Sequence, residues 1–374
     1  MTRHPDPARE AAIRDFLETC GWGGAARADL AGDASTRRYE RLTLDGRPAV
    51  LMDWPAGPDA PPAADGGDDA KHAYSAIAHL AENVRPFVAV DNYLTGLGLT
   101  APDIIASDLD RGFLLLEDLG DAVLGDILDQ GMGPEGEPLD EIYRASIELL
   151  VRLQAEGAPE SLPINEGGGD GSAHELPHFD DGLLRAELDV PLDWYFPVVL
   201  GREASAAQRE EFHALWTDLW PLMQAGPRAL CLRDFHSPNI LWLSGQKGLK
   251  RVGLIDFQDA FLGSRAYDVV SLLQDARKTV PAEREEVMLD FYVACAKDTL
   301  PGFDEEAFRA AYAVFGAERG LRLIGLWPRL LKRDGKPHYM AHMPRTKSYL
   351  RRNLAHPALG DLKRWIDANL PLDD

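Results

Sequence analysis

The pattern of hydrophobic and polar positions predicts a mixed segment of helices and strands at the start of the chain. Apolar residues recur at helical spacing between Ala8 and Cys20, which predicts an amphipathic helix. Two short β-type runs flank Asp45-Gly46, a dipeptide that suits the tight turn of a hairpin. A second helical stripe and an apolar strand at residues 113–116 follow. Short strands joined by tight turns favour an antiparallel sheet in this part of the chain.

Helical spacing dominates beyond residue 119. Asp304 precedes one of these helical segments and is its expected N-cap, because a carboxylate there accepts hydrogen bonds from free backbone N–H groups. We therefore expect an α+β protein with an N-terminal lobe at residues 1–118, which holds the antiparallel sheet, and a larger, mainly helical lobe at residues 119–374. The apolar stripes that predict the helical core are Tyr143, Ile147 and Leu150; Phe212, Leu215, Trp216, Leu219 and Met223; and Phe308, Ala311, Tyr312 and Phe315.

The chain is long and strongly acidic. Its 374 residues exceed one ordinary compact core and suit two lobes. The formal net charge of -22 argues against binding to nucleic acid or to an anionic membrane surface, since both need basic patches. Cys20, Cys231 and Cys295 lack CxxC spacing, so neither a disulfide framework nor a zinc site is expected. No apolar run reaches membrane-spanning length, and we expect a cytoplasmic protein without an obligate protein partner.

The stretch between residues 229 and 273 holds the residues with the most specific chemistry. Two apolar runs in it are predicted strands; Asp234 and Asn239 follow the first, and Asp256 follows the second. Phosphoryl transfer needs a carboxylate that orients the attacking hydroxyl and accepts its proton, and hard oxygen ligands that hold Mg²⁺ against the ATP phosphates. Each of these three residues alone is common in proteins and does not indicate a kinase. Their order along the chain and their positions after strands together favour one. We expect Asp234 to be the base and Asn239 and Asp256 to be metal ligands, with ATP and Mg²⁺ as cofactors.

These segments resemble the catalytic loop and the metal-binding segment of protein-kinase-like phosphotransferases. The spacing of Asp234, His236 and Asn239 is similar to that of aminoglycoside and choline phosphotransferases, as is the later segment around Asp268. The resemblance implies a two-lobed protein-kinase-like fold with ATP and Mg²⁺ between the lobes. It also implies that Asp268 has a structural role, in which it supports the catalytic loop.

A closer resemblance extends over most of the chain, from about Leu30 to Leu350. Together, the segments that carry it are similar to those of the anomeric N-acetylmuramate/N-acetylglucosamine kinases of the aminoglycoside phosphotransferase-like family. This implies ATP-dependent phosphorylation of the C1 hydroxyl of a small-molecule amino sugar in peptidoglycan recycling. An aminoglycoside or choline kinase and a nucleotide-binding pseudokinase are the alternatives. The segments are residues 32–39, 50–53, 115–120, 233–239, 255–260 and 333–336.

The expected nucleotide site departs from a standard kinase in one respect. No lysine is present at residues 50–53, where the phosphate-binding lysine of kinases would lie. Arg37 or Arg38, in a polar turn, could replace it as a guanidinium contact to phosphate, and we favour this role for at least one of them; the alternative is that both are solvated surface residues. In kinases, the hinge between the two lobes binds adenine through backbone N–H and C=O groups. Residues 117–119 lie where this hinge is expected. We therefore expect ATP to contact Ser35, Thr36, Arg37, Arg38, Glu117 and Leu119.

Two segments are candidates for the sugar site. One places acids beside aromatic residues, a combination that suits sugar hydroxyls and a pyranose face; a helix end packed by Trp194 is the competing interpretation. The other, between Arg319 and Lys336, has six basic residues against a single acid and could bind an anion such as the lactyl carboxylate of N-acetylmuramate. A helical face paired with acidic surface elsewhere is the alternative there. The expected sugar contacts are His236, Glu187, Asp193, Trp194, Arg322 and Arg333.

Overall fold

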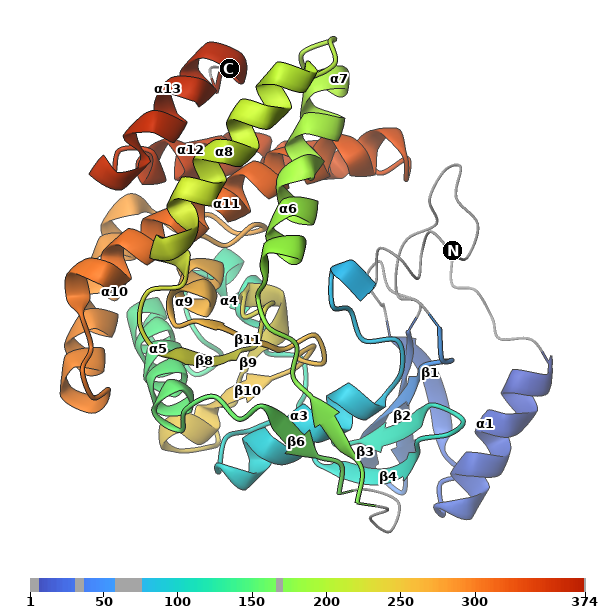
Figure 1. Cartoon of the computed structure of the whole chain (residues 1–374). Coiled ribbons are helices and arrows are strands. Elements are labelled where there is room, and N and C mark those ends of the chain that lie inside the picture. The colour runs from blue at the N-terminus through green and yellow to red at the C-terminus, as the bar shows by residue number, and fades with distance from the viewer. Residues whose placement is uncertain (1–6, 31–36, 58–75, 166–170, 373–374) are drawn as a thin grey trace. The chain divides into compact units, whose positions relative to one another are not determined.

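The computed structural model describes residues 7–30, 37–57, 76–165 and 171–372 (Figure 1). The backbone divides into two compact units. Unit 1 consists of Met1–Asp121, Ser161–Glu175 and Gly253–Asp259, and unit 2 consists of Ala122–Glu160, Leu176–Val252 and Ala260–Asp374. The chain first leaves unit 1 at Asp121, close to the expected boundary at residue 118, and two later segments return to it.

Unit 1 contains a five-stranded antiparallel sheet. Its strands lie in the order β1-β2-β3-β5-β4. Asp45 and Gly46 form the two-residue turn between β2 and β3, and both have positive φ, at 52° and 76°. This is the conformation for which Asp-Gly is suited, so the predicted hairpin is confirmed. The strands are β1 (Ala26–Leu30), β2 (Arg38–Leu44), β3 (Arg47–Asp53), β4 (Ile104–Asp108) and β5 (Phe113–Leu116).

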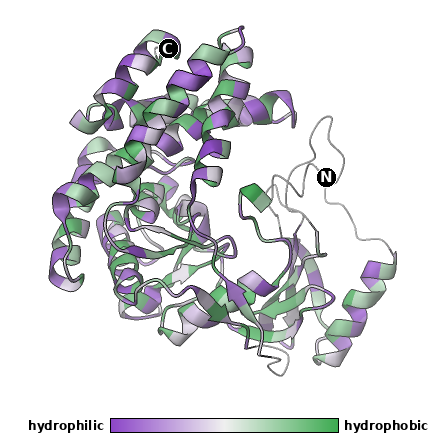
Figure 2. Cartoon of the chain, in the orientation of Figure 1, coloured by the Kyte–Doolittle hydropathy of each residue, from purple (hydrophilic) through white to green (hydrophobic). Residues whose placement is uncertain are grey.

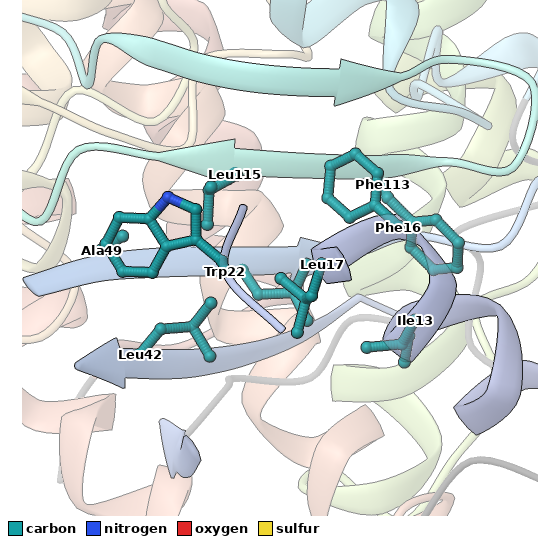
Figure 3. Close-up of a cluster of buried hydrophobic side chains, with 9 residues drawn as sticks. Ile13, Phe16, Leu17, Trp22, Leu42, Ala49, Phe113 and Leu115 are labelled. Carbon is teal, nitrogen blue, oxygen red and sulfur yellow. The ribbon is translucent and has the colours of Figure 1, made fainter. Parts of the chain in front are cut away.

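The first helix of the chain packs against this sheet. Helix α1 (Pro7–Thr19) buries Ile13, Phe16 and Leu17, the residues of its apolar stripe. Figure 3 shows these side chains against residues from three strands, and the ring of Phe16 stacks on Phe113 with centroids 5.5 Å apart. Unit 1 also holds α3 (Arg85–Gly96) and two short strands, β6 (Ser161–Pro163) and β7 (Ala173–Glu175).

Unit 2 is mainly helical. Strands β8 (Arg228–Cys231) and β11 (Phe261–Ser264) pair in antiparallel fashion within it, and β9 (Ile240–Trp242) follows the predicted catalytic loop. Strand β10 (Val252–Leu254) carries the chain from unit 2 into unit 1. The helices are α4 (Leu124–Gln130), α5 (Leu139–Ala155), α6 (Asp181–Val190), α7 (Phe196–Val198), α8 (Ala206–Met223), α9 (Ala266–Leu273), α10 (Ala282–Thr299), α11 (Glu305–Lys332), α12 (Met343–Asn353) and α13 (Gly360–Asn369).

Helix α11 is the longest helix of unit 2, with 28 residues. The carboxylate of Asp304 caps it by accepting a hydrogen bond from Ala307 N at 3.0 Å, as predicted. Its apolar stripe is buried, and so are nearly all members of the stripes predicted for α5 and α8. A π-helical turn at Pro191–Tyr195 continues α6 and packs on α11 at Gly325, where a Cβ atom would lie 2.5 Å from the Pro191 nitrogen. The expected α+β architecture is confirmed.

Hydrophilic positions interrupt the apolar ones along the long helices (Figure 2). Among the helices that the structure describes, none combines the length and the low polarity that a membrane-spanning helix requires.

Candidate active site

The predicted catalytic loop begins with a sharp turn at the end of β8. Arg233 has a positive φ of 69°, and the backbone N–H of Asp234 donates to Leu232 O at 2.8 Å. A hydrogen bond between residues two apart around a positive φ is a γ-turn, which is strained for a residue other than glycine. Such a conformation persists only where neighbouring groups hold it.

Asp268 of α9 holds this turn. Its carboxylate accepts hydrogen bonds from Leu232 N at 2.6 Å and from Arg233 N at 3.1 Å, and the residue is only 1% exposed. Burial raises the pKa of the Asp268 carboxyl to about 7, although the two backbone N–H groups act in the opposite direction. These contacts are those of a residue that supports the loop, the role that the resemblance implies.

The other end of the loop is held by a residue that the sequence analysis did not select. Asp275 is buried and accepts hydrogen bonds from the backbone N–H groups of Ser237, Arg277 and Lys278 at 2.8, 2.6 and 2.8 Å. Between these two anchors, Asn239 Nδ2 donates to Asp234 O at 3.0 Å. Because this bond orients the amide, its Oδ1 oxygen is the atom that Asn239 can offer to a metal ion.

Positive charge surrounds the Asp234 carboxyl. Burial raises its pKa, but His236, Arg319 and Arg233 lower it, and the pKa lies below the ordinary value of an aspartate. Burial also lowers the pKa of His236, so at neutral pH the arginines supply the lasting positive charge. Asp234 is therefore held as a carboxylate, able to accept a hydrogen bond from a substrate hydroxyl.

Asp256 lies in unit 1, just after β10, and also has a positive φ, of 62°. Its Oδ1 accepts hydrogen bonds from Arg37 Nη1 at 2.7 Å and from Gln258 Nε2 at 3.2 Å. The guanidinium of Arg37 lies 5.0 Å from the ring centroid of Trp54, in cation–π range. Arg37 thus sits beside a predicted metal ligand, where a phosphate-binding cation is needed.

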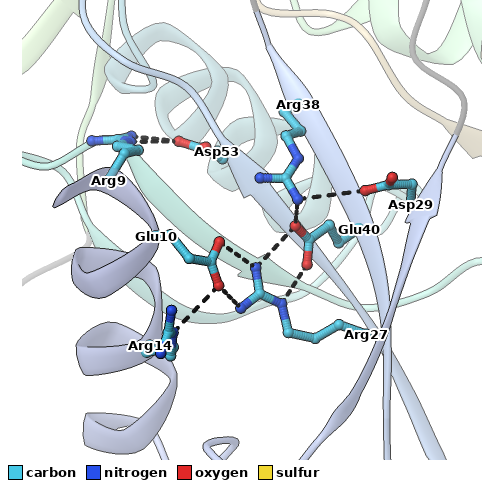
Figure 4. Close-up of polar contacts among 8 residues, drawn as sticks. All are labelled: Arg9, Glu10, Arg14, Arg27, Asp29, Arg38, Glu40 and Asp53. Carbon is cyan, nitrogen blue, oxygen red and sulfur yellow. Dashed lines mark hydrogen bonds and ion pairs between the residues drawn. The ribbon is translucent and has the colours of Figure 1, made fainter. Parts of the chain in front are cut away.

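Arg38, its neighbour, is engaged within the sheet of unit 1 (Figure 4). Its Nη2 contacts Glu40, which also pairs with Arg27, and lies 3.4 Å from Asp29. The same figure shows Asp53, at the end of the lysine-free strand, bound by Arg9 Nε at 2.8 Å. Of the two expected arginines, Arg37 is therefore the one that reaches a predicted metal ligand. Ser35 and Thr36 lie outside the described residues.

The predicted adenine contacts follow β5. The Glu117 N–H donates to Asp103 O at 2.8 Å, and its carboxylate accepts from Asp103 N at 3.3 Å. Leu119 N–H and C=O have no hydrogen-bond partner among the residues described by the structure. The backbone at Leu119 therefore offers both a donor and an acceptor to a base.

Of the expected sugar-site residues, Glu187 and Arg322 lie together near the catalytic loop. Arg322 Nη1 donates to Glu187 Oε1 at 2.7 Å, and Arg233 Nη2 approaches the same oxygen at 3.8 Å. His236 belongs to the catalytic loop itself, where it is buried and its backbone N–H donates to Asp234 O at 2.9 Å. Asp193, Trp194 and Arg333 lie elsewhere in unit 2.

Asp193 is half exposed and pairs with Arg209 of α8 at 2.6 Å. Trp194, also in the π-helical turn, is partly buried. Arg333 binds its neighbour Asp334 through two hydrogen bonds, at 2.7 and 2.9 Å. Three of the expected sugar contacts therefore lie apart from the Glu187–Arg322 pair.

Two further ionisable residues of α11 matter here: Glu318, which the sequence did not single out, and Arg319, which was named only as the first member of the basic stretch between Arg319 and Lys336. Both are buried in the described structure. A signal was present, since they continue the helical spacing of the stripe beyond Phe315, where an exposed charge is not expected. Charged residues in register with a buried stripe are candidates for function.

Asp256 of unit 1 and Asn239 of unit 2 each carry an oxygen of the kind that Mg²⁺ takes as a ligand. A carboxylate (Asp256) and an amide oxygen (Asn239) are hard ligands, and Mg²⁺ bound to a nucleotide takes few protein ligands because phosphates and water complete its shell. No cluster of three or more His, Cys, Asp and Glu side chains, as a zinc site would need, occurs among the described ranges.

Comparison with known proteins supports a phosphotransferase. The pattern of the phosphotransferase enzyme family matches residues 28–312. A Caulobacter vibrioides protein described as N-acetylmuramate/N-acetylglucosamine kinase is 38% identical over 369 residues, which cover 98% of each chain. A Pseudomonas putida protein of the same description is 31% identical and covers 95% of this chain and 92% of its own.

Solved structures show the same fold at low sequence identity. A choline/ethanolamine kinase family protein from Mesorhizobium loti has a TM-score of 0.51 at 13% identity, covering 96% of this chain and 99% of its own. The gentamicin-APH(2")-IIa complex has a TM-score of 0.55 at 12% identity, with the same coverage. At these identities the likeness concerns the fold alone.

Proposed function

Because the chain belongs to the phosphotransferase enzyme family, we propose that it is an ATP-dependent kinase of N-acetylmuramate and N-acetylglucosamine. One observation carries the proposal: a relative described as an N-acetylmuramate/N-acetylglucosamine kinase is 38% identical along nearly the whole of both chains. The finer part of the proposal is that the C1 hydroxyl of the sugar receives the phosphoryl group. Such a reaction serves the re-use of cell-wall sugars in peptidoglycan recycling, in the cytoplasm.

In this proposal Asp234 is the base. Its carboxylate orients the C1 hydroxyl toward the γ-phosphate and takes the proton as the new O–P bond forms and the bond to ADP breaks. The low pKa of Asp234 means that positioning of the hydroxyl is its main contribution. An anomeric hydroxyl is more acidic than a simple alcohol, which reduces the demand on the base.

Asn239 and Asp256 are the proposed ligands of Mg²⁺, which when bound offsets charge on the ATP phosphates. Arg37 is the proposed replacement for the missing lysine. Its contact with Asp256 supports this, since phosphates held by the metal would come within reach of the same guanidinium. Leu119 supplies the proposed backbone contacts to adenine.

The test is an assay of ADP release with Mg-ATP and a panel of acceptors. We expect release with N-acetylmuramate and with N-acetylglucosamine. We also expect an acid-labile product that no longer reduces copper, because a phosphate on C1 blocks the reducing end. Phosphorylation at another hydroxyl would leave a reducing product and overturn the C1 assignment.

Choline and kanamycin belong in the same panel. Release with one of these alone would mean an amino-alcohol or aminoglycoside kinase. Nucleotide binding without turnover on any acceptor would mean a regulatory module instead of an enzyme.

A further inference from the structure

Arg319 of unit 2 is a buried arginine that has no hydrogen-bond or ion-pair partner among the described residues. Arg319 of α11 is 5% exposed, and its Nε and Nη1 groups are buried and have no hydrogen-bond partner in the described part of the chain. No ion pair of Arg319 is present there either. A buried guanidinium ordinarily has carboxylate or carbonyl partners, because burial of an unpaired charge costs several kcal/mol.

Glu187, the carboxylate that contacts Arg322 and Arg233, forms no ion pair with Arg319 in the described structure. Glu187 is already shared, since Arg322 donates to it at 2.7 Å and Arg233 approaches the same oxygen at 3.8 Å. One carboxylate therefore faces two guanidinium groups before Arg319 is counted.

Glu318 adds no negative charge to this group. It is 0% exposed, and neither of its carboxyl oxygens has a hydrogen-bond partner within the described structure. Burial raises the pKa of Glu318 well above its usual range, and the negative charge of Glu187 raises it further. Burial therefore favours the neutral form of Glu318, and Glu318 forms no ion pair with Arg319 in the described structure.

Arg319 also lies close enough to the proposed base to act on it. Its positive charge is among those that lower the pKa of Asp234, although the two side chains form no ion pair. The surrounding cluster is not sealed, because 19% of the Arg322 side chain is exposed. An apolar residue at position 319 would extend the stripe of α11 without this electrostatic cost. The unpartnered charge therefore indicates a ligand anion near the reacting hydroxyl.

We infer that Arg319 recognises the carboxylate of the lactyl ether, the group that N-acetylmuramate has and N-acetylglucosamine lacks. This inference rests on the proposed function and makes Arg319 a specificity-determining residue within it. N-acetylglucosamine, the neutral sugar, binds at the same site, and water then solvates the Arg319 guanidinium. A guanidinium–carboxylate hydrogen bond is among the stronger ones in proteins, and its loss lowers affinity by about tenfold or more.

The test compares two variants of α11. Arg319→Met keeps an unbranched aliphatic side chain and removes its charge; Lys332→Met removes a positive charge from an exposed position of the same helix. We measure kcat/KM for both sugars. In Arg319→Met the ratio of the N-acetylmuramate value to the N-acetylglucosamine value should fall about tenfold or more. In Lys332→Met this ratio should equal that of the wild type.

Binding provides a readout that does not depend on turnover. Calorimetry without nucleotide compares N-acetylmuramate with its methyl ester, which has the same skeleton and no charge. The wild type should prefer the acid, and Arg319→Met should bind both alike. Its melting temperature should stay the same or rise, because removal of an unpaired buried charge does not destabilise the core.

Three results separate the possible failures. An unchanged ratio in Arg319→Met, with the wild type active on both sugars, would overturn the inference and leave the proposed function intact. Equal losses on both sugars would assign Arg319 to a group common to both reactions, such as the transferred phosphate, and would also overturn it. A wild-type protein that neither binds nor phosphorylates either sugar would overturn the proposed function, and the inference with it.

Discussion

Replacement of Asp268 tests how the catalytic loop is held. Asp268→Ala removes the acceptor of two buried backbone N–H groups, those of Leu232 and Arg233. Each buried donor left without a partner costs about 1–3 kcal/mol, so we expect a loss of about 2–6 kcal/mol. This is a large share of the roughly 5–15 kcal/mol by which folded proteins are stable. The γ-turn that positions Asp234 should relax as well.

Thermal unfolding and kinase assays measure this effect. For a unit of roughly 150–250 residues, 1 kcal/mol lowers the melting temperature by about 2–4 °C, so Asp268→Ala should lower it by at least about 4 °C. Turnover measured well below the transition should also fall, because the base is displaced. Ser271→Ala is the matched control: Ser271 is a buried residue of α9 whose hydroxyl lies 3.5 Å from Arg233 O, too long for a strong bond. Its melting temperature should stay close to that of the wild type.

The pH dependence gives a second check on Asp268. Its pKa of about 7 in the folded protein lies above the ordinary aspartate value of 3.8, so folding favours the protonated carboxyl. The stability that this group contributes is therefore fully present below the unfolded pKa and is lost as the pH rises through about 7. The stability of the wild type relative to Asp268→Asn, which does not titrate, should decrease between about pH 4 and pH 7. A melting temperature of Asp268→Ala within 1 °C or so of the wild type would refute the whole account of the loop.

Three further variants probe the base, the phosphate cation and the π-helical turn. Asp234→Ala should abolish turnover and leave ATP binding nearly intact, measured by equilibrium titration with nucleotide; wild-type-like rates would mean that another group is the base. Arg37→Ala should raise the KM for ATP about tenfold or more, and Arg37→Lys should restore part of it because a positive charge is kept; no change in either would exclude a phosphate contact. Gly325→Ala should lower the melting temperature by several degrees, because its Cβ would lie 2.5 Å from the Pro191 nitrogen and overpacking costs about 1–3 kcal/mol; an unchanged melting curve would show that the turn yields easily.

The local elements of this protein could be predicted from its sequence because short-range interactions form them. Asp45 and Gly46 adopt the positive φ values of a tight turn, and the Asp304 carboxylate caps the helix that begins one residue later. The interval between Asp234 and Asn239 is likewise short, so its chemistry could be recognised without a fold. Such features depend on residues a few positions apart.

The supports of the catalytic loop could not be predicted in the same way. Asp275 binds Ser237 N across 38 residues of sequence, and no local pattern distinguishes it from a surface acid. Asp268 was assigned from a resemblance and not from its own surroundings. Which backbone N–H groups these acids bind is decided by the packing of α9 against the loop. That packing depends on contacts between residues far apart in the chain.

The sequence by itself determined which charged residues are present on α11 and that some of them continue its apolar stripe. Only the tertiary structure decided which of these charges are neutralised. Arg333 is bound by its neighbour Asp334 and Arg322 by Glu187, whereas Arg319 has no acidic partner in the described structure. The physical reason is that a charge is neutralised by what lies within a few ångströms of it in space, and a sequence orders residues only along the chain.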